Sequence, residues 1–229
     1  MVLPSLSSQV EIQCQGVLFD MDGVLISSID SVERSWRKWA TGRGLDPAHA
    51  LSIVHGCRAE DTMRKLGLDI DLAVELKVLE DLEVADQVGV RALDGVLELI
   101  QTLPRERWTV VTSATGRLAR TRLAAAGIVP PERMISGDDV AEGKPNPAPY
   151  LAGAALLGVR PEECVVLEDS FSGVAAGRAA GCTVIATTFT HPAEDLTAAH
   201  YLLHDVTGVR VEQADAGLTL RLEPLATRG

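Results

Sequence analysis

Short, largely apolar runs alternate along most of the chain with segments of helical periodicity. Apolar runs of this length, with little polar alternation, are typical of buried parallel strands. They lie at residues 16–19, 109–112, 134–135, 164–167 and 183–186. The helical segments between the later runs lie at residues 95–103, 117–126, 148–157 and 173–180. This alternation predicts an α/β fold, a doubly wound, Rossmann-like parallel sheet with helices on both faces.

The segment from residue 31 to residue 87 shows helical periodicity alone. Val32, Trp36 and Trp39 fall near one face of a first helix, and an acidic helix follows at about residues 69–88. Because one strand precedes this segment and the others follow it, we predict a small all-α cap domain inserted after the first strand. We assign the core and the cap, respectively, to residues 1–28 with 92–229, and to residues 29–91.

The C-terminal pattern differs again, since apolar and polar residues alternate there. Val209-Arg210-Val211 and residues 218–222 have the period of half-buried strands, and Asp215-Ala216-Gly217 between them is a turn signal. We predict a β-hairpin that joins the edge of the sheet in antiparallel fashion.

Composition and charge narrow the function classes. Hydrophobic residues make up 46% of the 229 residues, yet no apolar run approaches the ~20 residues that would span a bilayer. The net charge of −11 disfavours nucleic acid and anionic membranes as partners. The four cysteines are scattered without a paired spacing, which is typical of a protein in the reducing cytoplasm. We expect a cytoplasmic monomer that binds a small molecule.

Reactive side chains follow three of the predicted strands. Asp20 and Asp22 come directly after the first strand, Ser113 follows the second, and Glu168 and Asp169 follow the fourth. In an open parallel sheet the carboxyl ends of the strands lie along one edge, where ligands bind. We therefore expect these side chains to converge.

Electrostatics limit what such a cluster can do. Several carboxylates at one place repel one another unless a cation lies among them, and Mg²⁺ is held in proteins by a few carboxylates, waters and a phosphate. Lys144, in a loop rich in proline and glycine, and the Ser113 hydroxyl would then contact the remaining phosphate oxygens. The sequence predicts a Mg²⁺ site that receives a small phosphorylated metabolite.

Four motifs in order carry a family resemblance. They are Asp20-Met21-Asp22-Gly23, Thr112-Ser113, Gly143-Lys144-Pro145 and Glu168-Asp169-Ser170. Together they resemble the motifs of the haloacid dehalogenase superfamily of phosphotransferases, and the helical insertion resembles the cap of that superfamily. Each motif alone is weak, but four in order at predicted strand ends are specific.

The resemblance implies a role for each motif residue. Asp20 would attack phosphorus and form an aspartyl-phosphate, and Asp22 would act as general acid and then as general base. Ser113, the backbone N–H of Ala114 and Lys144 would hold the phosphate oxygens.

The resemblance also implies a metal site. Mg²⁺ would be held by the carboxylates of Asp20 and Asp169 and by the backbone carbonyl of Asp22, with Glu168 nearby. Because the members of this superfamily that cleave carbon–halogen bonds lack a carboxylate at the position of Asp22, its presence favours phosphoryl transfer.

Within the superfamily, parts of the chain are most similar to phosphatases of small sugar and polyol phosphates. In the cap we single out His55 and Arg58 as residues that could select the substrate. The similar stretches are residues 36–39, 55–56 with 58, 103–108 and 111–113.

Two alternatives stay open beside a phosphatase. A β-phosphoglucomutase-type enzyme would be expected to carry a cap histidine where this chain has Val32, a lysine where it has His55 and an arginine where it has Ala59. A non-catalytic sensor of phosphorylated metabolites would be free to lose Asp20 or Asp22, and both are present.

Overall fold

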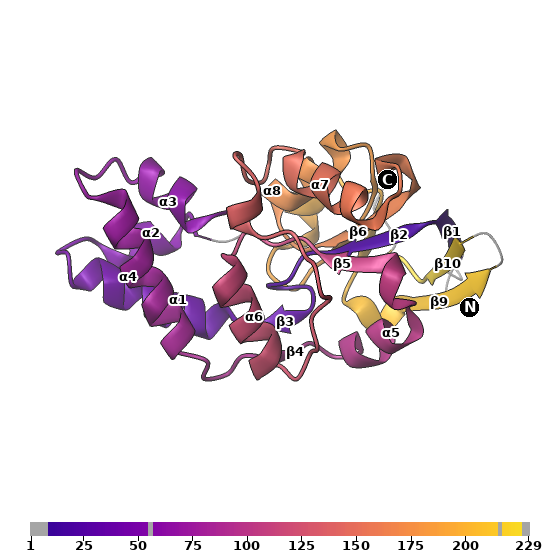
Figure 1. Cartoon of the computed structure of the whole chain (residues 1–229), viewed down its shortest axis with the longest axis horizontal. Coiled ribbons are helices and arrows are strands. Elements are labelled where there is room, and N and C mark those ends of the chain that lie inside the picture. The colour runs from indigo at the N-terminus through magenta and orange to yellow at the C-terminus, as the bar shows by residue number, and fades with distance from the viewer. Residues whose placement is uncertain (1–8, 55–56, 215–216, 226–229) are drawn as a thin grey trace, which may run out of the picture.

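The computed structural model describes residues 9–54, 57–214 and 217–225. Its centre is a five-stranded sheet in which all neighbouring strands are parallel, in the order β5-β2-β6-β7-β8. Figure 1 labels β5, β2 and β6 of this sheet. The strands are β2 (Gly16–Phe19), β5 (Trp108–Val110), β6 (Cys164–Glu168), β7 (Thr183–Thr187) and β8 (Tyr201–Leu203). Val17 lies opposite Trp108 on one side and Val165 on the other, so β2 and β6 end side by side. The predicted doubly wound core is confirmed.

Alternate residues of β2 belong to different layers. Val17 and Phe19 pack with the side chains of α5 and α6, whereas Leu18 packs with those of α7 and α8. Figure 1 shows these two pairs of helices on opposite faces of the sheet. The helices are α5 (Val96–Thr102), α6 (Gly116–Ala125), α7 (Ala148–Leu157) and α8 (Phe171–Ala179). Apolar strands are therefore covered on both faces, as their composition requires.

Four helices follow β2 and lie together at one end of the molecule (Figure 1). Trp36, Trp39 and Leu79 are buried in a hydrophobic core of their own, so the two tryptophans serve packing as the helical pattern predicted. Asp46 and Asp71 cap two of these helices through their side chains. The helices are α1 (Ile29–Thr41), α2 (Pro47–Leu51), α3 (Ala59–Lys65) and α4 (Leu72–Ala85).

A two-stranded antiparallel ribbon lies where the chain leaves the core and returns to it. In it, Ile26 of β3 (Ile26–Ser27) lies opposite Ala92 of β4 (Arg91–Ala92). We propose that this ribbon bounds the cap formed by residues 29–91, and that residues 1–28 and 92–229 form the core.

The C-terminal hairpin is present but does not extend the main sheet. β9 (Val209–Ala214) and β10 (Gly217–Leu222) form a separate sheet with β1 (Val10–Cys14), in the order β1-β10-β9. The predicted addition to the edge of the main sheet was therefore wrong. The physical reason is that the apolar face of β10 packs into the core, beside Ile12 of β1, while β8 occupies the sheet edge next to β7. Residues 215 and 216 of the predicted turn lie outside the described residues.

Other differences from the prediction also concern strands, since β8 at the edge of the main sheet, β1, and the short strands β3 and β4 were not predicted. The apolar run at residues 134–135 forms no full strand, and Ile135 makes only an isolated bridge to Val111. Short 3-10 helices occur at Arg105–Arg107, Gly137–Asp139, Pro161–Glu163, Ala193–Leu196 and Val206–Gly208.

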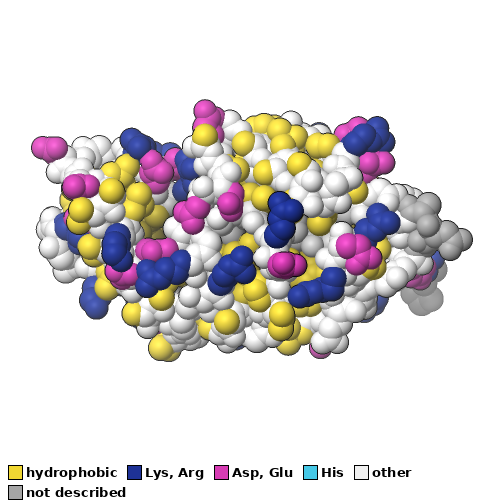
Figure 2. Space-filling model, viewed as in Figure 1, with side chains coloured by type: hydrophobic (Ala, Val, Ile, Leu, Met, Phe, Trp, Pro, Cys, Tyr) yellow, Lys and Arg dark blue, Asp and Glu magenta, His cyan; other side chains and the backbone are white. Residues whose placement is uncertain are grey.

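The surface in Figure 2 mixes Lys and Arg with Asp and Glu over the face shown. Among the described residues no helix is both long enough and apolar enough to cross a membrane.

Candidate active site

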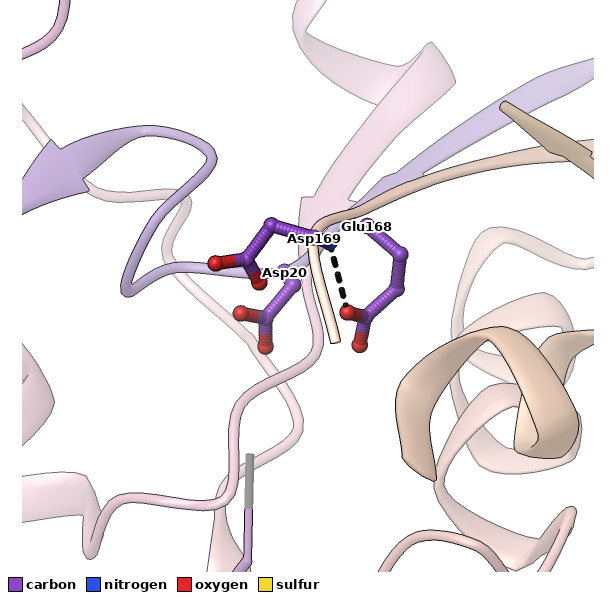
Figure 3. Close-up of side chains that lie close together, drawn as sticks. All are labelled: Asp20, Glu168 and Asp169. Carbon is purple, nitrogen blue, oxygen red and sulfur yellow. Dashed lines mark hydrogen bonds between the residues drawn. The ribbon is translucent and has the colours of Figure 1, made fainter. Parts of the chain in front are cut away.

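Three carboxylates meet where β2 and β6 end. Figure 3 shows the side chains of Asp20, Glu168 and Asp169 gathered at this edge, and one carboxylate oxygen of each lies within 4.8 Å of the others. All three residues are buried. The parallel register causes the meeting, because Phe19 and Leu167 lie opposite each other and the next residue of each strand follows directly. Convergence of these residues, expected from the sequence, is thus a feature of the structure.

Lys144 enters this cluster from the loop before α7. Its ammonium donates to Asp20 Oδ1 at 2.5 Å, to Glu168 Oε1 at 2.7 Å and to the carbonyl oxygen of Val111 at 3.1 Å. The side chain is buried, so three acceptors replace the water that an ammonium normally binds. Lys144 therefore neutralises part of the charge of the carboxylate cluster.

Burial and mutual repulsion set the pKa values of the cluster. Desolvation raises the pKa of Asp20 to about 7, with Glu168 and Asp22 adding to the rise and Lys144 opposing it. Desolvation likewise raises the pKa of Asp169 well above its usual range. For Glu168 desolvation is outweighed by Lys144 and by hydrogen bonds, which lower the pKa of this carboxyl. When all three carboxylates are ionised, the cluster holds more negative charge than Lys144 alone can balance.

Both carboxylate oxygens of Glu168 accept hydrogen bonds from the surrounding protein. Oε1 accepts from Lys144 and, at 2.8 Å, from the hydroxyl of Tyr150, while Oε2 accepts from the N–H groups of Asp169 and Ser170 and from the Ser170 hydroxyl. A Cβ on Gly173 would lie 1.6 Å from Glu168 Oε1, so the helix can approach only because this position lacks a side chain. Glu168 thus orients Lys144.

Asp169 has partners that sequence reasoning missed. Its carboxylate accepts from the hydroxyl of Thr190, and its backbone carbonyl lies 3.0 Å from Nδ1 of His191. Gly23 makes room for it, since φ there is +86° and a Cβ would lie 1.8 Å from Asp169 Oδ2. A side chain at position 23 of the first motif would collide with Asp169, which explains why this position is glycine. Thr190 and His191 carried no signal in the sequence because they lie in a loop far from any motif.

Asp22 lies on the cap side of the site. Its carboxylate accepts from the hydroxyl of Ser28 and, at 3.2 Å to each oxygen, from Nη1 of Arg122. Arg122 also donates from Nη2 to Glu83 Oε1 at 3.1 Å. Sequence reasoning missed Arg122, although a signal existed: it occupies the same buried stripe of α6 as Leu118.

The predicted phosphate-binding residues follow β5. Ser113 Oγ is buried and has no hydrogen-bond partner among the described residues. The N–H of Ala114 donates to Thr112 Oγ1 at 3.1 Å. An unpartnered buried hydroxyl costs free energy, and a phosphate oxygen would satisfy it. This orphaned group fits an anion at the same edge as the carboxylates.

A cavity of about 440 Å³ lies between the cap and the core, lined by Asp20, Asp22 and Asp169 among other residues. Apolar side chains form part of its wall, and acidic side chains add to it. The larger apolar ones are Ile29, Val32, Trp36, Val54, Leu76 and Leu118. The acidic ones, beyond the three aspartates, are Glu60, Glu80, Glu83 and Asp138.

The two cap residues singled out from the sequence have different outcomes. His55 lies outside the described residues. Arg58 lines the cavity, but its guanidinium hydrogen bonds to the carboxylate of Asp61 and to the carbonyl oxygen of Val140. Arg58 thereby links the cap to the loop that carries Lys144, and its role in substrate selection stays a prediction.

The donor set suits a hard divalent cation. The ligand atoms that lie together here are carboxylate oxygens of Asp20, Glu168 and Asp169. Desolvation is the main cause of the raised pKa values of Asp20 and Asp169, repulsion from Glu168 adds to it, and a cation at this place would oppose both effects. Mg²⁺ therefore fits the residues at this edge.

Comparisons with known proteins agree with this geometry. The family model described as haloacid dehalogenase-like hydrolase matches residues 14–181. Hexitol phosphatase A of Escherichia coli is 38% identical over 210 residues, covering 90% of this chain and 97% of its own length. Glycerol-1-phosphate phosphohydrolase 1 of Saccharomyces cerevisiae is 34% identical over 202 residues, covering 82% of this chain and 80% of its own.

A solved structure shares most of the fold. A hydrolase from Pseudomonas syringae superimposes with a TM-score of 0.75 at 25% identity, covering 83% of this chain and 94% of its own. The match of the family model over most of the chain, with the expected motifs gathered at one edge of the sheet, leads to a single conclusion. The chain belongs to the haloacid dehalogenase-like hydrolase family.

Proposed function

We propose that the protein is a Mg²⁺-dependent phosphatase that hydrolyses phosphate monoesters of small sugars or polyols. The observation that carries the proposal is the buried contact of Lys144 with Asp20, a carboxylate that lines the cavity beside Asp169. The curated relatives named as hexitol and glycerol-1-phosphate phosphatases support the same class of substrate.

Asp20 is the proposed nucleophile. One carboxylate oxygen attacks phosphorus, the bond from phosphorus to the ester oxygen breaks, and the leaving alkoxide takes a proton from Asp22. In the second step Asp22 takes a proton from water, the water oxygen attacks phosphorus, and the bond to Asp20 breaks to release phosphate. Ser113, the N–H of Ala114 and Lys144 hold the transferring oxygens.

For the metal, the proposed ligands are the carboxylates of Asp20 and Asp169 and the backbone carbonyl of Asp22. Glu168 is the weaker candidate of the predicted set, because five donors already engage its oxygens. When bound, Mg²⁺ supplies positive charge that reduces repulsion between the carboxylates and the phosphate. Lys144 contributes to the same screening from the protein side.

The charges of the cavity favour an uncharged polyol or sugar as the leaving group. Acidic side chains outnumber basic ones in its lining. Each lysine or arginine of the lining pairs with a carboxylate: Arg58 with Asp61, Lys77 with Asp81, and Arg122 with Asp22 and Glu83. A second phosphate or a carboxylate on the substrate would therefore meet repulsion rather than a free cation.

The two alternatives are less well supported. For a mutase, the resemblance would require a histidine at the position of Val32, an apolar residue in the cavity wall. A non-catalytic sensor would have no use for a nucleophile, an acid/base residue, a lysine and metal-binding carboxylates at one edge of the sheet.

The four free thiols suit a protein of the reducing cytoplasm. The monomeric state stays a prediction.

Phosphate release from a substrate panel tests the proposal. The panel holds hexitol phosphates, glycerol phosphates, 2-phosphoglycolate and a sugar bisphosphate, each with Mg²⁺, with EDTA, and with the Asp20→Asn variant. We expect turnover of the uncharged polyol and sugar esters that needs both the metal and Asp20, with weaker turnover of the two substrates that carry a further anion. Activity that persists in Asp20→Asn, or isomerisation of β-glucose 1-phosphate without release, would contradict the proposal.

A further inference from the structure

Arg122 is a buried cation that the proposed reaction does not use. It lies on α6, is only 3% exposed, and lines the inner wall of the cavity. Nη1 contacts both oxygens of Asp22 and Nη2 contacts Glu83, while Nε finds no acceptor among the described residues. These two carboxylates are therefore its hydrogen-bond acceptors in the described chain.

The two carboxylates come from different parts of the molecule. Asp22 belongs to the core loop after β2, whereas Glu83 belongs to α4 of the cap. Glu83 is itself buried, and desolvation raises its pKa against the opposing effect of Arg122. A buried charge is tolerated only when it is paired, so Glu83 and the guanidinium hold each other in place. The position of Arg122 therefore depends on how α4 packs against α6.

We propose that Arg122 is a positioning residue for the general acid. It holds the carboxylate of Asp22 in one orientation, and Glu83 fixes Arg122 in turn when α4 packs against α6. Protonation of the leaving alkoxide thereby depends on the placement of the cap. The inference rests on the proposed function, because it assumes that Asp22 protonates a leaving group.

The chain offers a matched control for cap packing. Arg117 lies on the same helix and also bridges to α4, through Glu80 at 3.0 Å and Asp81 at 2.6 Å. Its partners do not include Asp22, and its side chain is 51% exposed. A variant of Arg117 weakens the contact between α6 and α4 without touching the proposed acid.

The test compares two leaving groups. A polyol phosphate releases an alkoxide that needs a proton, whereas p-nitrophenyl phosphate releases a stable phenolate that needs none. The ratio kcat/KM reports the steps up to cleavage of the ester bond, so it isolates the first use of Asp22. The Arg122→Lys variant keeps the charge but cannot span both carboxylates with a planar fork.

For Arg122→Lys we expect kcat/KM to fall about 30-fold on the polyol phosphate and less than about threefold on the aryl phosphate, a fraction of the usual contribution of an acid/base group. Arg117→Lys should leave the ratio between the two substrates unchanged. Equal losses on both substrates in Arg122→Lys, or the same selective loss in Arg117→Lys, would overturn the inference.

Glu83→Gln provides a second, independent variant. It should produce a smaller loss with the same selectivity, and the double variant with Arg122→Lys should lose less than the product of the two single losses, because both act through one guanidinium. If the loss of kcat/KM in the double variant equalled the product of the two single losses, Glu83 and Arg122 would act independently and the inference would be overturned. A wild-type protein that releases phosphate from neither substrate would overturn the proposed function and the inference with it, whereas wild-type turnover with unselective losses overturns the inference alone.

Discussion

Lys144 donates a hydrogen bond of 2.5 Å to Asp20 although 124 residues separate them in the sequence. Neither group has access to much water, and Glu168 holds the lysine from its other side at 2.7 Å. The fold thus places one cation among several carboxylates before any ligand binds. Both the stability of the protein and its chemistry should depend on this contact.

Replacing Lys144 by Met removes the cation and leaves the carboxylates uncompensated. Loss of one partner from a buried ion pair costs about 3–5 kcal/mol, so we expect a loss of this order in the free energy of unfolding without Mg²⁺. Added Mg²⁺ should restore part of it, because the ion replaces the missing charge, while phosphatase activity stays lost. Chemical denaturation with and without Mg²⁺ measures both effects.

Lys38→Met is the control for this variant, since Lys38 is exposed on α1. It should change the free energy of unfolding by less than ~0.5 kcal/mol. If Lys144→Met were as stable as Lys38→Met in EDTA, the carboxylate cluster would not need its lysine.

The pKa of Asp20 predicts how metal binding depends on pH. Desolvation raises this pKa from 3.8 to about 7, so between these values the folded, metal-free protein holds a proton that the unfolded chain releases. The contribution of Asp20 to stability therefore falls as pH rises from about 3.8 to about 7 in the absence of metal. Because Mg²⁺ must displace this proton, its affinity should rise by at least about tenfold per pH unit below pH ~7. Asp169, whose pKa desolvation also raises, adds to this dependence.

Thermal melts with a Mg²⁺ titration at several pH values measure this dependence. In Asp20→Asn, which has no titrating group at this position, the dependence of Mg²⁺ affinity on pH should be shallower, and the part that remains belongs to Asp169. Equal slopes in the wild type and in the variant would show that another group releases the proton.

Much of the fold and of the site could be predicted from the sequence, because the signals were local. The apolar run of residues 16–19 and the apolar run that begins at Cys164 are followed by Asp20 and by Glu168, and parallel pairing then brings these two residues together, with Asp169 next in the chain. The strand β1 was missed, although Val10, Ile12 and Cys14 alternate with polar residues. Its partner lies at the other end of the chain, and no local pattern reveals such a pairing.

The environment of the site was harder to predict than its motifs. Arg122 lies in the buried stripe of α6 and Glu83 lies on an acidic helix, but neither position shows which residue the side chain will contact. Only the packing of α4 against α6 buries them together beside Asp22. A single sequence gives helix faces, but the pairing of faces from different domains depends on tertiary contacts.

The close approach of Gly173 to Glu168 predicts an unusual effect of alanine. In a helix, Gly→Ala normally stabilises by about 0.4–1 kcal/mol. Here a Cβ would lie 1.6 Å from Glu168 Oε1, so α8 or the carboxylate must move. We expect Gly173→Ala to lower the melting temperature and to weaken phosphatase activity, since Glu168 orients Lys144.

Gly208→Ala is the matched control, because the nearest atom to its Cβ would be 3.8 Å away. It should leave both the melting temperature and the activity near the wild-type values. Gly173→Ala with wild-type values of both would mean that the packing of α8 on Glu168 is looser than the structure indicates.

Alanine variants of Ser113 and Ser35 distinguish an effect on phosphate binding from an effect on the stability of the fold. The hydroxyl of each is buried without a hydrogen-bond partner in the described part of the chain, but Ser113 lines the cavity and Ser35 lies on α1, outside the cavity lining. Removing an unsatisfied hydroxyl relieves its desolvation penalty, so both Ser→Ala variants should be as stable as the wild type, or more stable by up to ~1 kcal/mol.

The two serine variants should differ in activity. If Ser113 donates to a phosphate oxygen as charge develops, Ser113→Ala should lower kcat/KM by about 10- to 100-fold, somewhat less than the loss of an oxyanion-hole donor. Ser35→Ala should keep the wild-type kcat/KM, because it touches only the cap core. Phosphate-release kinetics and chemical denaturation of both variants give the comparison. A Ser113→Ala enzyme with full activity would remove Ser113 from the phosphate site, and a destabilised one would mean that its hydroxyl has a partner in the free protein.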